Sequence, residues 1–138
     1  MHLSGTRKKT QRGYHTRRNI WDDAYDLEVW RGGEKLDPGV NYFVLALNQM
    51  GLATAYSCEG HPDAFYVTFD APYNVAFKIK EAGFFSVEIE GKNYWSIRNH
   101  INRRGAEGER IDAFRWAAEA WEKHFGPLDL EAAELVFD

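Results

Sequence analysis

The sequence lacks the features of a secreted or membrane-spanning protein. Its one cysteine, Cys58, has no second thiol with which to form an internal disulfide, which fits a reducing compartment. No run approaches the roughly 18 consecutive apolar residues that cross a bilayer, and residues 1–18 contain no apolar stretch of the signal-peptide type. We therefore expect a cytoplasmic protein that contacts no membrane.

Charge is divided unevenly along the chain, because no acidic residue precedes Asp22. The net charge of −4 combines a basic N-terminal segment with a remainder that has 11 bases against 21 acids, or −10. We name residues 1–18 the basic arm, and its six bases are Arg7, Lys8, Lys9, Arg12, Arg17 and Arg18. The arm is poor in apolar side chains and cannot offset its own ordering entropy, so we expect it to be flexible without a partner. Such a segment docks on phosphates or on an acidic protein groove, or else it is a solvated tail that aids solubility.

The remaining residues, 19–138, predict a single α+β domain. With 44% hydrophobic and 15% aromatic residues, the chain has enough material for one packed core. A helix is predicted from Asp37 and Pro38 to Gly51, with Asp37 as its cap and Pro38 at its first position. Its inward positions recur at helical spacing and are Val40, Phe43, Val44 and Leu47. Strands are predicted at 52–57 and 65–69, on either side of a loop at 58–63.

The same order of elements is predicted a second time. Residues 70–72 open a helix that Gly83 ends, and a hairpin of 84–90 and 94–98 follows across Gly91 and Lys92. The inward residues of this helix are Val75, Ala76, Ile79 and Ala82. The chain thus contains a helix-strand-strand unit used twice, as a repeat of architecture rather than of side chains.

Further elements are predicted on either side of these two units. A strand at 25–30, ending in the turn at 31–33, would bring a mainly antiparallel sheet to about five strands. A helix at 109–125 has an apolar stripe that predicts packing on the sheet, formed by Ile111, Phe114, Ala118, Trp121 and Phe125. For residues 128–138 the pattern leaves open a docked strand or a short helix.

The loop at 56–62, Tyr-Ser-Cys-Glu-Gly-His-Pro, brings a thiol, a carboxylate and an imidazole together around a glycine. Cys58 stands where a strand is predicted to end, a place from which sheets often present functional groups. Gly60 gives the backbone conformations that other residues avoid. If the protein is an enzyme, its catalytic residues are therefore expected to be Cys58, Glu59 and His61.

Four interpretations of this loop stay open. Cys58 could be a nucleophile activated by His61, or both could belong to a metal site completed by His15, His100, Glu59 or Asp63. Glu59 and His61 could form an acid-base pair beside a buried Cys58. In the structural interpretation, Cys58 packs, Glu59 and Gly60 turn the chain, and His61 caps a backbone group. We expect no cofactor and no metal, and a non-catalytic role rather than catalysis.

A second cluster, at 94–104, mixes aromatic and basic residues. Alternation places Trp95 and Ile97 on one face of the strand and Tyr94, Ser96 and Arg98 on the other. Arg98 is followed by two further bases, Arg103 and Arg104. Such interleaving occurs on surfaces that stack on nucleic-acid bases and neutralise phosphates. In the alternative interpretation, Trp95 belongs to the core and the arginines only solvate a loop.

Residues 47–69, LNQMGLATAYSCEGHPDAFYVTF, carry two resemblances. The segment resembles small proteins of phages and mobile elements in its order of elements, which is a helix ending in glycine, a strand, the motif S-C-x-G-H and another strand. That resemblance implies an origin of this kind and brings no activity with it. The Ser57, Cys58 and Gly60 turn is also similar to that of the tRNA wybutosine-synthesising methyltransferase family. His61 stands where that family has arginine, so its activity is not carried over.

These features predict an accessory protein that binds nucleic acid or a nucleoprotein complex. The basic arm would supply the attraction, Arg98, Arg103 and Arg104 a second contact, and the loop at Cys58 to His61 a specific one. One alternative is an inhibitor of a host defence complex, of the anti-CRISPR kind, that acts by protein binding. A second alternative is a small enzyme that acts on a nucleotide or RNA.

Overall fold

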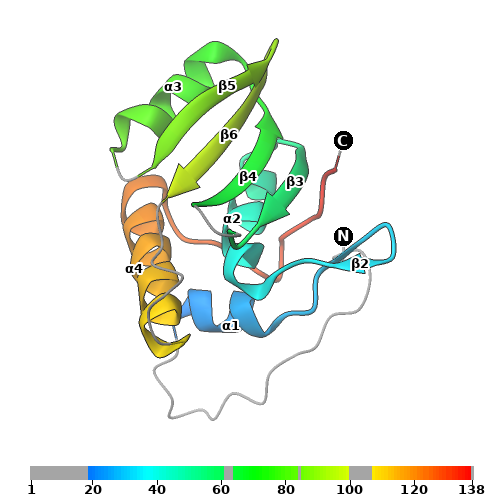
Figure 1. Ribbon diagram of the computed structural model, residues 1–138, viewed down its shortest axis with the longest axis vertical. Coiled ribbons are helices and arrows are strands. Elements are labelled where there is room, and N and C mark those ends of the chain that lie inside the picture. The colour runs from blue at the N-terminus through cyan, green and yellow to red at the C-terminus, as the bar shows by residue number, and fades with distance from the viewer. Residues whose placement is uncertain (1–18, 61–63, 84, 100–106, 138) are drawn as a thin grey trace.

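The computed structural model describes residues 19–60, 64–83, 85–99 and 107–137. They form the α+β fold that the sequence predicts (Figure 1). The helices of this described part are α1 (Ile20–Asp26), α2 (Pro38–Gln49), α3 (Tyr73–Glu81) and α4 (Glu107–Phe125). Its strands form one sheet of four strands and a separate sheet of two.

The four-stranded sheet is antiparallel throughout and confirms the unit used twice. Its strands, in spatial order, are β3 (Thr54–Cys58), β4 (Phe65–Asp70), β6 (Tyr94–Asn99) and β5 (Ser86–Gly91). The first unit is α2-β3-β4 and the second is α3-β5-β6, so the second strands of the two units pair at the centre of the sheet. The first strand of each unit, β3 or β5, consequently lies at an edge.

Helix α2 is the central element of the core. It begins with Pro38, whose missing N–H costs nothing at the first position, and Gly51 follows its end with φ +84. The sequence predicts one inward face, but all residues from Gly39 to Asn48 are buried. The reason is that α1 and α4 pack on α2 in addition to β3 and β4.

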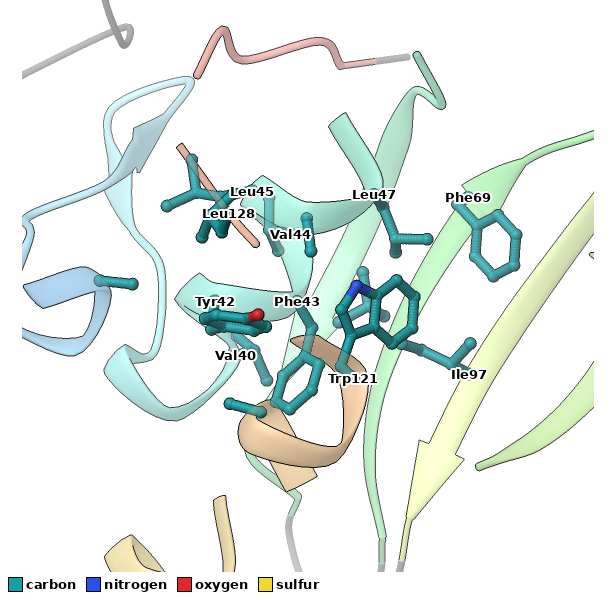
Figure 2. Packing of buried hydrophobic residues seen from close by; sticks show 14 of the residues in the cluster. Val40, Tyr42, Phe43, Val44, Leu45, Leu47, Phe69, Ile97, Trp121 and Leu128 are labelled. Carbon is teal, nitrogen blue, oxygen red and sulfur yellow. The ribbon is translucent and has the colours of Figure 1, made fainter. Parts of the chain in front are cut away.

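Aromatic side chains from α2, α4 and the sheet meet in the core. The ring of Phe43 lies 5.1 Å from Phe65, 5.4 Å from Phe85 and 6.3 Å from Trp121, measured between ring centres. Figure 2 shows Phe43 and Trp121 side by side between α2 and the strands. Phe114 of α4 lies 5.4 Å from Phe65. The apolar stripe of α4 therefore faces the sheet, as the sequence predicts.

The strand predicted at 25–30 is wrong. Residues Ile20–Asp26 form α1, because Asn19 accepts a hydrogen bond from the Asp22 N–H while the Asp22 carboxylate accepts one from the Asn19 N–H. Such a reciprocal cap fixes the first turn of a helix. The chain then forms a short hairpin, β1 (Trp30–Arg31) and β2 (Glu34–Lys35), outside the main sheet. The main sheet consequently has four strands rather than about five.

The C-terminal segment docks on the edge of the sheet at β3. Residues 130–132 form a turn, and the Thr54 N–H donates to the Val136 carbonyl over 3.0 Å. Phe137 forms an isolated parallel bridge with Thr54, and the Asn48 side chain also donates to the Val136 carbonyl. Of the two alternatives left open by the sequence, the structure has an extended, docked end.

Candidate functional site

The loop after β3 is built around the position of Cys58. This residue ends the strand, pairs with Tyr66 of β4 and is partly buried. The Gly60 N–H donates to the Cys58 sulfur over 3.3 Å, and Gly60 has φ +106. The predicted need for glycine at this turn is therefore met, since this backbone conformation is costly for any other residue.

Glu59 is bound to the start of α2. Its Oε1 accepts a hydrogen bond of 2.6 Å from the Gly39 N–H, and its own N–H donates to Asp37 Oδ2 over 3.0 Å. A helix start has N–H groups without an intrahelical partner, and a carboxylate there also interacts favourably with the helix dipole. Glu59 thus caps α2 from 20 residues further along the chain.

The role predicted for Asp37 is corrected by the same contacts. Asp37 is the N-cap residue of α2, but its side chain makes no capping hydrogen bond to that helix. Its carboxylate is directed to the Glu59 N–H instead, and Glu59 takes over the capping of Gly39. The Asp37 carboxylate thus binds the loop, and the Glu59 carboxylate binds the start of α2.

The Glu59 carboxylate affects elements other than α2. Its charge acts on Tyr25 of α1, since the pKa of the Tyr25 hydroxyl is raised first by burial and then by the charge of Glu59. It also lies against α4, since a Cβ placed on Gly39 would meet both Glu59 Oε1 and the Phe114 ring. A carboxylate held in this way braces the fold, and this favours the structural interpretation of Glu59 over a general acid or base.

Replacing Glu59 with alanine is expected to lower the free energy of unfolding by about 1 kcal/mol, the typical cost of losing a helix cap. Glu59→Gln keeps an oxygen for the Gly39 N–H but loses the charge at the helix start, so we expect about half that cost. Urea unfolding followed by circular dichroism measures both values.

A matched control is Glu134→Ala, since Glu134 is exposed near the C-terminus. Its expected change is within about 0.5 kcal/mol. Equal stability of the Glu59→Ala and Glu134→Ala variants would contradict a capping role for Glu59.

The outer face of the four-stranded sheet, opposite α2, brings the two predicted clusters together. Cys58 pairs with Tyr66, and Tyr66 pairs with Arg98, so these residues are neighbours across three strands. The Arg98 guanidinium lies 5.3 Å from the centre of the Tyr66 ring. Trp95 and Ile97 are buried on the opposite face, as alternation predicts. The sequence signal for Tyr66 is the same alternation, because Phe65 and Val67 point into the core.

Arg98 is bound by acidic residues of the neighbouring strand. Its Nε lies 3.2 Å from a Glu88 oxygen and its Nη2 lies 3.6 Å from a Glu90 oxygen. Ser96 also donates to Glu90 over 2.8 Å. Two carboxylates exceed the charge of one guanidinium, and the other two bases of this predicted cluster, Arg103 and Arg104, lie outside the described residues.

Several predicted site residues lie outside the described residues. They are His61, Arg103 and Arg104, and the six bases of the basic arm, Arg7, Lys8, Lys9, Arg12, Arg17 and Arg18. Within the described part, no three or more His, Cys, Asp or Glu side chains gather in a way that could hold a metal ion. The helices of that part also include none with the length and apolar character needed to span a bilayer.

No family model, curated protein or solved structure matches the chain.

Proposed function

We propose that the protein is a non-catalytic accessory protein of a nucleic-acid or nucleoprotein complex. The observation that carries this conclusion is the separation of charge: the basic arm has six bases and no acid, and the residues after it have 21 acids and 11 bases. A basic segment is drawn to phosphates over long range. Residues 19–138, which we name the acidic body, are repelled by phosphates. Contact with nucleic acid is therefore confined to the arm, and the acidic body is available to bind a protein.

The described surface of the body supports this division, because several of its bases are already paired with acids. The Nη2 atom of Arg115 lies 2.7 Å from Asp22 Oδ1, and its Nη1 atom lies 2.8 Å from Asp112 Oδ1. Lys35 lies 3.8 Å from Glu28. With Arg98 held by Glu88 and Glu90, these bases have local partners that phosphates would have to displace.

The use of Glu59 supports a role without catalysis. A general base must be within reach of the proton that it abstracts, but one oxygen of Glu59 is bound to the Gly39 N–H and its backbone is bound to Asp37. These bonds connect the loop to α2 and support a structural role for Glu59.

Removing charge from the basic arm is expected to weaken nucleic-acid binding and its dependence on salt. In Arg7→Gln/Lys8→Gln/Lys9→Gln, the slope of log K against log salt concentration should become shallower by about 2 to 3, because each phosphate contact contributes about 0.9. Fluorescence anisotropy with a labelled duplex, over a series of potassium chloride concentrations, measures the slope.

The matched control removes three exposed bases from the body, as Lys78→Gln/Lys92→Gln/Lys123→Gln. This variant should keep the slope and affinity of the unaltered protein. Absence of duplex binding at low salt, or equal losses in the two triple variants, would exclude attraction through the arm.

A further inference from the structure

A groove of about 450 Å³ lies between α3 and β5, away from the loop at Cys58. Two charged residues line it, Lys80 and Glu88, and the other lining residues are apolar: Tyr73, Ala76, Phe77, Val87, Ile89 and Trp95. Sites of this size with a mostly apolar lining are typical of binding sites. The sequence does not predict this groove, because Tyr73 and Phe77 are not among the inward positions predicted for α3.

Large apolar side chains are exposed along the groove in the part of the chain that the structure describes. Tyr73 is 64% exposed, Phe77 is 42% exposed and Ile89 is 71% exposed. The Tyr73 ring is stacked on Phe77 at 5.8 Å and lies 5.9 Å from Trp95. A contiguous exposed patch of this kind on a small protein marks an interaction surface.

The groove runs beside β5, which among the described strands has a neighbour on one side only. β5 pairs with β6 and is the last strand of the sheet, with α3 beside it (Figure 1). The opposite edge, β3, receives the C-terminal segment through Thr54. An edge strand presents N–H and C=O groups to which another strand can pair. Because side chains of a strand alternate between its two faces, a strand added to β5 would place every second side chain in the neighbouring groove.

We propose that β5 binds an extended segment of a partner protein in which apolar and basic side chains alternate. The apolar side chains enter the groove, where six of the lining residues are apolar. The basic side chains lie over the outer face, beside Glu88 and Glu90. Among the described residues, the ion pairs of these two carboxylates are with one guanidinium, that of Arg98, so the outer face of β5 keeps one net negative charge.

A second copy of the chain does not suit this edge. In a dimer, two β5 strands would pair antiparallel about a two-fold axis. The outer faces of the two sheets would then be continuous, and outward side chains of one copy would lie opposite outward side chains of the other. The outward side chains of β5 are Ser86, Glu88 and Glu90, so a pairing centred on Glu88 or on Ile89 places glutamates of the two copies against each other. Like charges directly opposed destabilise strand pairing.

Binding at β5 does not depend on the basic arm and would persist if the arm bound no nucleic acid. The test uses the full chain and blocked peptides of eight residues that alternate isoleucine with lysine. A second peptide has glutamate in place of lysine, and a third has the isoleucine-lysine sequence with N-methylated amides that cannot pair with an edge strand. Amide shifts in NMR titrations locate the site and give the dissociation constants.

We expect the isoleucine-lysine peptide to bind, with shifts in β5 and α3, and the other two peptides to bind at least about tenfold more weakly. Tyr73→Ala should weaken binding about tenfold. Tyr56→Ala should not change it, although Tyr56 is 67% exposed, because Tyr56 lies on β3. Glu88→Lys/Glu90→Lys should reverse the preference in favour of the glutamate peptide.

Three results would overturn the assignment: no binding of the isoleucine-lysine peptide at millimolar concentration, equal binding of all three peptides, or shifts centred on α4. Sedimentation of the protein alone tests the other occupants. A dimer that Ile89→Lys dissociates would make a second copy the occupant and would equally overturn the assignment. A monomer in which Ile89→Lys abolishes peptide binding would support it.

Discussion

Replacing Trp121 with alanine is expected to lower the free energy of unfolding by about 3 to 5 kcal/mol. Trp121 is 2% exposed and holds α4 against the rest of the core. Its ring centre lies 5.6 Å from Phe85, 6.3 Å from Phe43 and 4.6 Å from Phe125. Alanine would leave a cavity among rings that cannot collapse to fill it, which adds to the lost burial of the indole.

The same helix supplies a control with the same substitution. Trp116 is 79% exposed, so Trp116→Ala should change the free energy of unfolding by no more than about 0.5 kcal/mol. Urea unfolding followed by circular dichroism measures both. The midpoint should fall clearly only in Trp121→Ala, and the slope should be unchanged in both variants. Similar losses in the two variants would mean that α4 does not pack on the core through Trp121.

Much of the fold could be predicted because its elements have strong local signals. Pro38 and Gly51 bound α2, and the alternation of Phe65, Val67 and Phe69 marks β4. The spacing of Phe114 and Trp121 gives the buried face of α4. In each of these segments the local preference agrees with the packing that the tertiary structure requires.

The error at residues 25–30 arose where two periods overlap. Tyr25, Leu27 and Val29 alternate like a strand, whereas Trp21 and Ala24 are spaced like the face of a helix. The helix forms because Asn19 and Asp22 cap its start and because Trp21 and Ala24 are buried where α1 packs on α2. A period alone could not decide between these structures, and the decisive contact came from another element.

The candidate site was located by sequence but its arrangement was not. Cys58 and Gly60 were placed correctly at a strand end and a tight turn, since both depend on local backbone geometry. The bond from Glu59 to the Gly39 N–H spans 20 residues and depends on how the loop folds over α2. The groove at Tyr73 and Ile89 likewise needs the order of the strands, which places β5 at the edge.

Replacing Gly39 with alanine is expected to lower the free energy of unfolding by about 2 kcal/mol, through overpacking. A Cβ at this position would lie 2.7 Å from Glu59 Oε1 and 2.9 Å from Cε2 of the buried Phe114 ring. The carboxylate can move away only by giving up its hydrogen bond to the Gly39 N–H, and the ring is held by its packing on Phe65. The clash therefore outweighs the gain of up to about 1 kcal/mol that alanine brings to a helix.

Gly108 provides the matched control, because it is also the second residue of a helix and a Cβ on it meets nothing within 4 Å. Gly108→Ala should leave stability unchanged or raise it by up to about 1 kcal/mol, so the two glycine variants should differ by about 2 to 3 kcal/mol in urea unfolding. In a Glu59→Ala background the cost of Gly39→Ala should fall by at least about 0.5 kcal/mol, since the carboxylate that the Cβ meets is then gone. Additive losses would instead place the whole cost on the Phe114 ring and show that the carboxylate yields freely. Equal effects of Gly39→Ala and Gly108→Ala would contradict the close approach of the loop to α2, on which the structural role of Glu59 depends.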